Sequence, residues 1–321
     1  CRRTARRGCA LDATGSWPGA PLQSIVGRPG SRRPELRERA LRALEECQLC
    51  PWRCGANRLR GDASPCWLGA DLRCYKTLLS LGEELELIPS QMVYLAGCNL
   101  RCSFCIQAPA SQDPHAGEPC PPADLAGQLL TAVAHGARTV NVLGGEPGIQ
   151  PVGLLELVAA AAPRRLPLVL NTNLYLTPAA LGLLLPVVEL LLVDFKFGAA
   201  RCASRLAGTP DYLETLTANL RRVRGWPLII RHLVLPGHLD CCLAPVARWV
   251  ARHLPGARFS LQLGYLPPLG LRGDPELGRP LDRETGAAAR RLVEGLGLRL
   301  TGLPSPSPRW AAPGAGSAAV R

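Results

Sequence analysis

From Ser90 onward, the chain alternates short β-rich runs with longer stretches that have helical periodicity. The β-rich runs are Met92–Ala96, Thr139–Leu143, Pro167–Leu170, Leu190–Val193, Leu228–Leu235 and Arg258–Leu263. Apolar residues recur near helical spacing in Pro122–His135, Val152–Ala162, Pro178–Leu184, Tyr212–Val223, Leu243–His253 and Arg283–Leu296. Strands that alternate with helices form βα units on a parallel sheet. Because six units are fewer than the eight that close a barrel, the sequence predicts an α/β fold with a partial (β/α)6, TIM-like barrel.

Unusual residues stand directly after these predicted strands. They are Gly97-Cys98, Gly144-Gly145-Glu146-Pro147, Asn171-Thr172-Asn173, Asp194-Phe195-Lys196, Pro236-Gly237-His238 and Gly264-Tyr265. The carboxyl ends of parallel strands meet at one edge of the sheet, where α/β folds build their active sites. The sequence therefore predicts one site that is assembled from several strand ends.

The formal net charge of +12 is concentrated near the amino-terminal end. Residues 1–60 hold thirteen arginines against five acidic residues, so the rest of the chain is only mildly basic. An Arg-rich stretch interrupted by Gly and Pro, from Cys1 to about Pro34, is typical of a disordered leader. We therefore expect no nucleic-acid partner, and RNA binding by the leader is the alternative.

Composition divides the chain into four parts. We expect a disordered basic leader over residues 1–34 and a Cys-rich extension over residues 35–89. The α/β core domain is expected over residues 90–300, followed by a disordered tail rich in Pro, Gly and Ala over residues 301–321.

The fourteen cysteines are better explained by metal binding than by disulfides. No signal peptide is recognisable, and the chain is far longer than the small secreted domains that disulfides stabilise. The apolar run Leu181–Val193 is interrupted by Pro186 and Glu189 and is too short to span a bilayer. We therefore expect a cytoplasmic protein with no membrane partner. Because the chain begins at Cys1 rather than Met, we expect a fragment or a processed product.

Three cysteines, Cys98, Cys102 and Cys105, lie within eight residues after the first predicted strand. A structural zinc site needs four ligands, commonly from two Cys-x2-Cys pairs, and no second pair follows directly. A [4Fe–4S] cluster also takes four ligands, so three cysteines leave one iron open to a substrate or cofactor. The strand-end position favours the open cluster, with zinc and unligated thiols as alternatives.

This Cys-x3-Cys-x2-Cys spacing, with Phe104 before the last cysteine and Gly144-Gly145-Glu146-Pro147 after the second strand, resembles the radical S-adenosylmethionine (SAM) superfamily. The resemblance implies the partial barrel of that superfamily and a [4Fe–4S] cluster whose open iron binds SAM. One electron from the reduced cluster would cleave SAM to methionine and a 5′-deoxyadenosyl radical. The resemblance also implies that the Gly-Gly-Glu-Pro segment holds the SAM amine, with an ordinary βα turn as the alternative.

Asp194-Phe195-Lys196 places two opposite charges on one side of an extended segment. A solvated ion pair is one interpretation. The segment resembles that of activases for glycyl-radical enzymes, which implies that Lys196 reaches the SAM carboxylate and that Asp194 helps to bind a monovalent cation. Lys196 is one of only two lysines, which favours a specific role. These activases carry Asp where this chain has Asn171, so the expected cation site has one carboxylate fewer.

Two histidines are associated with the fifth predicted strand: His232 lies within it and His238 follows it. The run from Arg231-His232 to Pro236-Gly237-His238 is similar to the same activases, which implies that His232 contacts the cofactor. A packed structural histidine is the alternative. His238 is a candidate from its loop position alone.

A second thiol group comprises Cys47, Cys50, Cys54 and Cys66. Four thiolates complete a ligand shell, so structural zinc or a closed iron–sulfur cluster is expected, with unligated thiols as the alternative. The run Leu-Cys-Pro-Trp-Arg-Cys-Gly-Ala-Asn-Arg-Leu-Arg-Gly-Asp resembles PflX-like iron–sulfur proteins, which are related to pyruvate formate-lyase activating enzyme. Departures from that pattern are Ser64, where Gly is usual, and Ile106-Gln107, where Gln-Asn is frequent.

The other cysteines have no partner in the sequence pattern. Cys74, Cys120 and Cys202 are isolated, and Cys1 and Cys9 lie in the leader. Cys241 and Cys242 stand at the start of a predicted helix, where a small buried thiol is the ordinary interpretation.

Taken together, the motifs predict a radical SAM enzyme, and the resemblance implies an activase that installs a glycyl radical on a partner protein. Radical modification of a peptide, RNA or small molecule, or a non-catalytic iron–sulfur protein, are the alternatives. We expect a protein or small-molecule substrate and an electron donor such as flavodoxin or ferredoxin.

Overall fold

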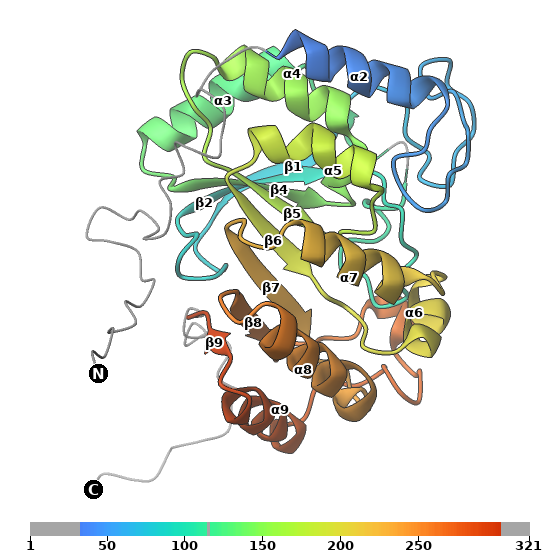
Figure 1. The fold of residues 1–321 in the computed structure, drawn as a ribbon, viewed down its shortest axis with the longest axis vertical. Coiled ribbons are helices and arrows are strands. Elements are labelled where there is room, and N and C mark those ends of the chain that lie inside the picture. Colours follow the sequence, from blue (N-terminus) through green and yellow to red (C-terminus); the bar gives the residue numbers. More distant parts are fainter. Residues whose placement is uncertain (1–32, 114–115, 303–321) are drawn as a thin grey trace, which may run out of the picture.

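The computed structural model describes residues 33–113 and 116–302. Its strands form one nine-stranded sheet in the order β3-β1-β2-β4-β5-β6-β7-β8-β9 (Figure 1). The strands are β1 (Arg73–Ser80), β2 (Ser90–Leu95), β3 (Glu118–Pro119), β4 (Thr139–Gly144), β5 (Leu168–Thr172), β6 (Leu190–Asp194), β7 (Leu228–Leu233), β8 (Arg258–Gln262) and β9 (Arg299–Leu300). Neighbouring strands from β2 through β4, β5, β6 and β7 to β8 are parallel, which confirms the six predicted βα strands and the partial barrel.

The helices follow the strands as the periodicity predicts. They are α2 (Pro34–Glu45), α3 (Pro122–Ala134), α4 (Pro151–Ala161), α5 (Pro178–Leu184), α6 (Ala200–Ala207), α7 (Tyr212–Arg222), α8 (Ala244–His253) and α9 (Arg283–Gly295). Thr177 caps α5 by accepting a hydrogen bond from the backbone N–H of Ala180, and Asp282 caps α9 in the same way from Thr285. Short 3-10 turns cover Pro147–Ile149, Leu185–Val187 and Leu269–Leu271, and a π-helical turn covers Leu239–Leu243.

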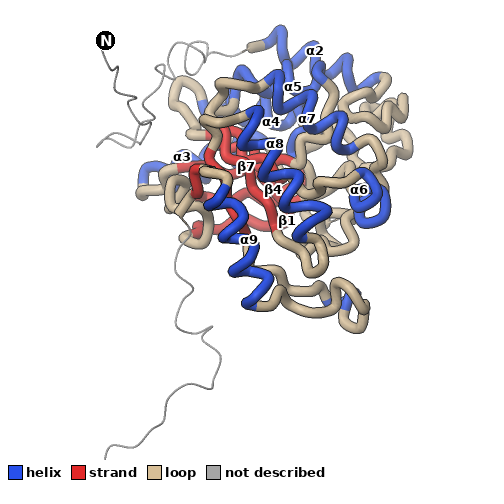
Figure 2. Tube along the Cα trace, turned by 60° about the horizontal axis from the view of Figure 1, so that its bottom comes forward, coloured by secondary structure: helices blue, strands red, loops and turns tan. Residues whose placement is uncertain are grey.

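The central strands are buried on both faces. Helices lie along the outside of the sheet (Figure 2), and every residue of β5 is buried. On the opposite face, Val169, Leu190, Leu192 and Ile229 form a second apolar cluster with Leu87. Strands covered on both faces become continuous apolar runs, which is why β5 and β6 contain consecutive Leu and Val residues.

The Cys-rich extension is joined to the same sheet. β1 pairs antiparallel with β2, and α2 buries Leu36, Ala40 and Leu44 on the side that contacts α4. The sequence interpretation assigned neither element, nor α6. Of the predicted leader (1–34) and tail (301–321), residues 1–32 and 303–321 lie outside the described residues, so their disorder stays a prediction, whereas Pro34 is the first residue of α2. Among the described helices, none has the length and apolar character that a membrane span needs.

Candidate active site

The three cysteines of the Cys-x3-Cys-x2-Cys motif line one cavity of about 410 Å³. Their loop leaves β2 at Gly97, whose positive φ of 78° suits glycine. Inside the loop, the backbone N–H of Leu100 donates to Cys98 Sγ (3.4 Å), and Cys105 N–H donates to the Cys102 carbonyl (3.1 Å). The loop therefore presents three thiols to a single open space.

The ends of the neighbouring strands form the walls of this cavity. Lining residues that the sequence singled out are Gly144, Gly145, Asn171, Asn173, Asp194, Lys196, Gly264 and Tyr265. Arg231 and Gln262, at the ends of β7 and β8, also line it. The expected convergence of strand ends is thus present.

A second depression, of about 490 Å³, lies along α9, and no cysteine or histidine lines it among the described residues.

The two glycines after β4 allow the cysteine loop to lie close to this strand. A Cβ on Gly145 would stand 1.8 Å from the Gly97 carbonyl oxygen, and Gly144 has φ +106° beside the Leu95 backbone. Glu146 N–H donates to the same Gly97 oxygen at 2.9 Å. The resemblance placed these glycines in the segment that holds SAM, and their tightest contacts within the protein are with backbone atoms.

Glu146 is buried behind the cavity and connects three strand ends. Its carboxylate accepts hydrogen bonds from Thr172 Oγ1 (2.6 Å) and from the backbone N–H groups of Gly148 (2.8 Å) and Asn173 (2.7 Å). Burial raises its pKa to about 7, although these donors favour the ionised form. The Asn173 amide in turn donates to Asn99 Oδ1 (2.9 Å) and to Cys98 Sγ (3.9 Å). Glu146 therefore positions the loop that carries Cys98.

Lys196 and Asp194 form an ion pair at the cavity wall. Lys196 Nζ lies 2.6 Å from Asp194 Oδ2, and the two side chains are 22% and 27% exposed. Burial alone would lower the pKa of Lys196, but the Asp194 carboxylate outweighs it and holds the pKa above its ordinary value. Burial raises the pKa of the Cys102 thiol to about 12, and the Lys196 ammonium acts in the opposite direction. A positive charge therefore stands near one of the three thiols.

Comparisons with known proteins agree with this arrangement. The model of the radical SAM superfamily matches residues 92–250. An uncharacterized protein of Methanocaldococcus jannaschii, MJ0674, is 31% identical over 270 residues, which are 82% of this chain and 78% of that protein. The chain belongs to the radical SAM superfamily. Membership implies a [4Fe–4S] cluster and SAM.

Other similar proteins match only parts of the chain. The 7-carboxy-7-deazaguanine synthase of Methanopyrus kandleri is 34% identical over 122 residues, which are 32% of this chain and 48% of that enzyme. SuiB of Streptococcus suis, solved with precursor peptide SuiA, is 17% identical with a TM-score of 0.48, over 63% of this chain and 46% of SuiB. A domain of pyruvate-formate lyase-activating enzyme from Bacteroides vulgatus is 22% identical with a TM-score of 0.42, over 51% of this chain and 97% of that domain.

Two predicted radical SAM site residues lie behind the cavity. Pro147 is buried in the 3-10 turn after β4. His232 is also buried, and its Nδ1 lies 2.6 Å from the Phe195 carbonyl oxygen. Since a carbonyl only accepts, Nδ1–H is the donor. Burial lowers the pKa of His232 to about 4, so the ring is neutral at pH 7. Neither residue lines the cavity among its described walls, and a cofactor role for them stays a prediction.

The wall at β7 is held by a buried ion-pair network. Arg231 binds Glu83 (2.6 Å) and Glu84 (2.7 and 2.8 Å), which lie in the connection between β1 and β2. Ser260 Oγ also donates to Glu84 at 2.7 Å. Burial would raise the pKa of Glu84, but Arg231 outweighs it and the pKa lies below its ordinary value. The sequence interpretation noted Arg231 only as part of a motif and missed both glutamates.

The amino-terminal thiols lie next to the radical SAM loop. Cys47, Cys50 and Cys66 are buried and Cys54 is exposed. Trp52 Nε1 donates to the Asn99 carbonyl (2.8 Å), which joins this segment to the loop. No three of these sulfurs lie within 4.8 Å of one another, whereas sulfurs on one tetrahedral zinc are ~3.8 Å apart. A second metal centre here stays a prediction.

Within the described part of the chain, one group of metal-ligating side chains is compact, unlike the two thiol groups above. Cys202, His238, Cys241 and Cys242 have ligand atoms that all lie within 4.8 Å of one another. The expectation that Cys202 is isolated was wrong, because its Sγ lies 3.7 Å from that of Cys241. The sequence signal that could have found part of this group is the spacing of His238, Cys241 and Cys242, which places all three on one side of a helical turn.

Proposed function

We propose that the cavity holds a [4Fe–4S] cluster on Cys98, Cys102 and Cys105, and that the chain cleaves SAM reductively. When bound, the cluster and SAM supply a 5′-deoxyadenosyl radical for hydrogen abstraction, with the electron coming from a donor of the flavodoxin or ferredoxin class. The observation that carries the proposal is the opening of all three thiols onto one cavity walled by strand ends. A three-thiol set in an open space leaves one iron for an external ligand.

The residues around the cavity fit these groups. Donation from Leu100 N–H and the Asn173 amide to Cys98 Sγ favours the thiolate form and tunes a sulfur-ligated cluster. The Lys196 ammonium is the cation assigned to the SAM carboxylate, since it lines the cavity near Cys102. Glu146 acts through Asn173 as a positioning residue. Asp194 holds Lys196 in place, and Asn171 contributes an amide to the same wall.

For the substrate, we favour a segment of a partner protein, as in an activase for a glycyl-radical enzyme. A cavity of about 410 Å³ is near the lower end of the ~300–1,000 Å³ range for pockets that hold one small ligand. SAM would fill much of it, so a substrate has to reach in from the rim. Two lining side chains, Ile106 and Leu266, are 71% and 54% exposed and give that rim apolar character.

Radical modification of a small molecule is the second candidate. It is favoured by the two methanogen proteins named 7-carboxy-7-deazaguanine synthase, which are 34% and 35% identical over 122 and 93 residues. These matches cover 48% and 36% of the two enzymes, so they bear on the shared core more than on a substrate pocket.

The radical step is tested by 5′-deoxyadenosine production. Anaerobically reconstituted protein with dithionite and SAM should form 5′-deoxyadenosine, whereas Cys102→Ala should form none. Cys120→Ala is the matched control, because Cys120 lies outside the cavity, and it should behave as the wild type. Electron paramagnetic resonance of the reduced cluster should change when SAM is added. An intact cluster that gives no product and an unchanged spectrum would favour a non-catalytic iron–sulfur protein.

The substrate step needs a separate readout. A candidate partner with a carboxy-terminal glycyl-radical motif, incubated with the active protein, should develop a glycyl-radical resonance that is lost with Cys102→Ala. If 5′-deoxyadenosine forms without a glycyl radical on the partner, and a small molecule increases its formation, the second candidate is favoured.

A further inference from the structure

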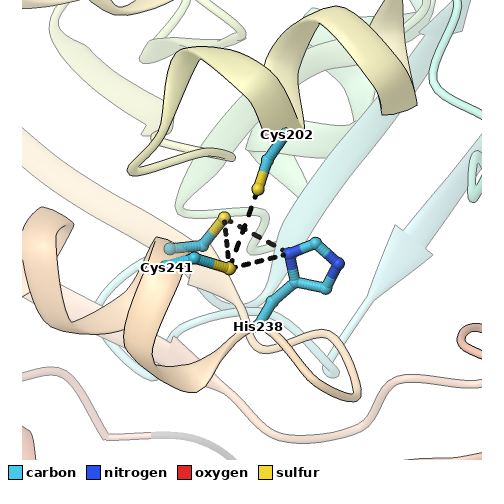
Figure 3. Close-up of side chains that lie close together, drawn as sticks. Cys202, His238 and Cys241 are labelled. Carbon is cyan, nitrogen blue, oxygen red and sulfur yellow. Dashed lines mark hydrogen bonds between the residues drawn. The ribbon is translucent and has the colours of Figure 1, made fainter.

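Four side chains that can ligate a metal converge in the connections that follow β6 and β7, outside the lining of the three-thiol cavity. Cys202 points from α6 toward Cys241 and His238, which belong to the connection between β7 and α8 (Figure 3). Cys242 completes the group. Cys202, His238 and Cys242 are buried, with exposures of 2–3%, and Cys241 is partly buried.

The distances between the donor atoms fit one tetrahedral ion. Cys241 Sγ lies 3.7 Å from Cys202 Sγ and 4.0 Å from Cys242 Sγ. Bond lengths of Zn²⁺ to sulfur and nitrogen place two sulfurs ~3.8 Å apart and a sulfur and a nitrogen ~3.5 Å apart. His238 Nδ1 lies 3.3 Å from Cys241 Sγ and 3.5 Å from Cys242 Sγ. The four donors are therefore close enough to one another to share one zinc ion.

The other side of the imidazole has the partner that metal-binding histidines usually have. His238 Nε2 has no well-directed hydrogen bond, and its near neighbour is Glu276 Oε1 at 2.9 Å. Arg205 binds both oxygens of Glu276, at 2.6 and 2.9 Å, and so fixes the carboxylate. A carboxylate on the outer nitrogen of a ligating histidine sets its tautomer and orientation. Nδ1 is then the nitrogen that faces the thiols.

The backbone around the group is built for close approach. His238 stands one helical turn before Cys241 and Cys242. The π-helical turn Leu239–Leu243 begins directly after His238 and contains both cysteines. Gly198, which precedes α6, meets this turn so closely that a Cβ there would lie 2.4 Å from the Cys242 carbonyl oxygen. This contact holds α6, and with it Cys202, against the π-helical turn.

We propose that Cys202, His238, Cys241 and Cys242 form a closed structural zinc site. Three sulfurs and one nitrogen complete the tetrahedral shell of Zn²⁺ and leave no position for a substrate. Binding replaces the thiol protons, which are released to solvent. A disulfide is the competing chemistry, but its sulfurs bond at ~2.05 Å and it uses neither the histidine nor the third thiol.

The zinc site fixes the helix that holds the active-site loop. The last turn of α6 accepts hydrogen bonds from that loop, from Arg101 N–H to the Ala207 carbonyl (3.3 Å) and from Ser103 N–H to the Leu206 carbonyl (2.9 Å). Both donors lie between cysteines of the Cys-x3-Cys-x2-Cys motif. An ion on Cys202 thus joins the β7–α8 connection, through α6, to the loop that carries Cys98, Cys102 and Cys105.

The first test is the zinc content of the full chain, isolated without iron reconstitution. Wild type, Cys242→Ala and Cys120→Ala are compared by mass spectrometry of the metal. Cys120 is the matched control, because it lies outside every thiol group described above. We expect Cys242→Ala to hold one zinc ion per chain fewer than the other two. Equal zinc content in the three proteins overturns the proposal. Zinc bound to the amino-terminal thiols would be present in all three proteins, so it would not change the difference between Cys242→Ala and the other two.

The second test includes a variant, His238→Cys, that keeps four metal-ligating side chains. Co²⁺ bound to the wild type should show thiolate-to-cobalt charge transfer and tetrahedral visible bands. His238→Cys should retain the ion and raise the charge-transfer intensity of this site by roughly one third, since a fourth thiolate joins three. Spectra that neither Cys202→Ala nor His238→Cys alters overturn the proposal. So does a Cys202–Cys241 disulfide found by peptide mapping of metal-free protein.

Discussion

The two thiol groups of the core differ in how their donors are spaced. Cys98, Cys102 and Cys105 stand around an open cavity of about 410 Å³, and no three of their sulfurs lie within 4.8 Å of one another. The group of Cys202, His238, Cys241 and Cys242 is compact and mostly buried. An open set leaves room for a cluster and its outer ligand, whereas a compact set suits one ion. Spacing and solvent access therefore separate a reactive site from a structural one, although both use cysteine.

The supports of the two groups also differ. The open group is held by a hydrogen-bond chain from Glu146 through Asn173 to Cys98, and by backbone contacts of two glycines. The compact group is held by a carboxylate–histidine contact and by the proposed ion itself. We thus expect a local change in the open group to disturb reactivity first, and loss of the ion in the compact group to disturb stability first.

The largest expected effect comes from substituting one cysteine in each group and comparing the two variants. Cys105→Ala should reduce 5′-deoxyadenosine to the level of a protein-free control and leave zinc unchanged, because Cys105 lines the cavity and is not one of the four proposed zinc ligands. Cys242→Ala should lose zinc and retain iron. Iron, zinc and product are measured on the same preparations. Zinc loss in Cys105→Ala, or full iron loss in Cys242→Ala, would contradict the separation of the two groups.

Removal of zinc should produce the next largest effect. A ligand at 100 to 1,000 times its dissociation constant stabilises the folded state by about 3–4 kcal/mol, and a chelator removes that stabilisation. Denaturant unfolding of iron-free protein is measured with and without chelator. The wild type should lose this stability on chelation, and Cys242→Ala should show a smaller response. Equal responses in both proteins would assign the metal-dependent stability to other ligands.

Glu146→Gln should weaken the support of the open group. The glutamine NH₂ group faces either the Asn173 N–H or both Thr172 Oγ1 and the Gly148 N–H, so at least one buried donor loses its acceptor, at about 1–3 kcal/mol each. Unfolding and the affinity of the loop for iron are measured together. Glu156→Gln is the control, since Glu156 pairs with Arg37 near the surface and such pairs contribute ~0–1 kcal/mol. Similar losses in both variants would argue against the positioning role.

Acid should produce the smallest effect, at the cavity wall held by Arg231. The folded-state pKa of Glu84 lies below 4.5, so its stabilising contribution is complete above pH 4.5 and is lost as pH falls through the folded pKa. Each unit of pKa depression corresponds to ~1.4 kcal/mol. Glu84→Gln should therefore flatten the loss of stability below pH 4.5. Stability is followed in chelator, so that acid release of zinc does not contribute. An unchanged slope would show that Glu84 is not coupled to folding.

The fold was predictable where its signal is local. Six of the seven parallel strands, all but the two-residue β9, and the helices from α3 to α9, except α6, follow from apolar periodicity, and the ends differ by at most two residues. α6 was missed because it has only eight residues, and three of its four buried residues are Cys or Ala, which give a weak apolar signal. β1 was missed because it is half exposed and gains its hydrogen bonds only from β2 and β3. A half-exposed strand of this kind has no strong pattern of its own.

The candidate site was predictable to the extent that its residues follow strand ends. Cys98, Cys102, Cys105, Gly144, Gly145, Asn171, Asp194 and Lys196 all line the cavity. Glu146 and Pro147 follow a strand end and His232 lies within β7, but all three are buried behind the cavity. The difference depends on which way each side chain points after the strand, and that is set by packing against the next strand. Glu83 and Glu84 carried no signal because they lie in the connection between β1 and β2 and do not follow one of the six predicted strands.

The sequence by itself determined the parallel α/β sheet and the open three-cysteine motif, because a period of apolar residues and a spacing of ligands are local properties of a chain. Only the tertiary structure decided that Glu146 supports the loop from behind, and that Cys202 meets three donors from residues 238–242. Both facts depend on segments far apart in sequence, which the packing of α6 and the π-helical turn brings together. Long-range contacts of this kind come from the fold as a whole.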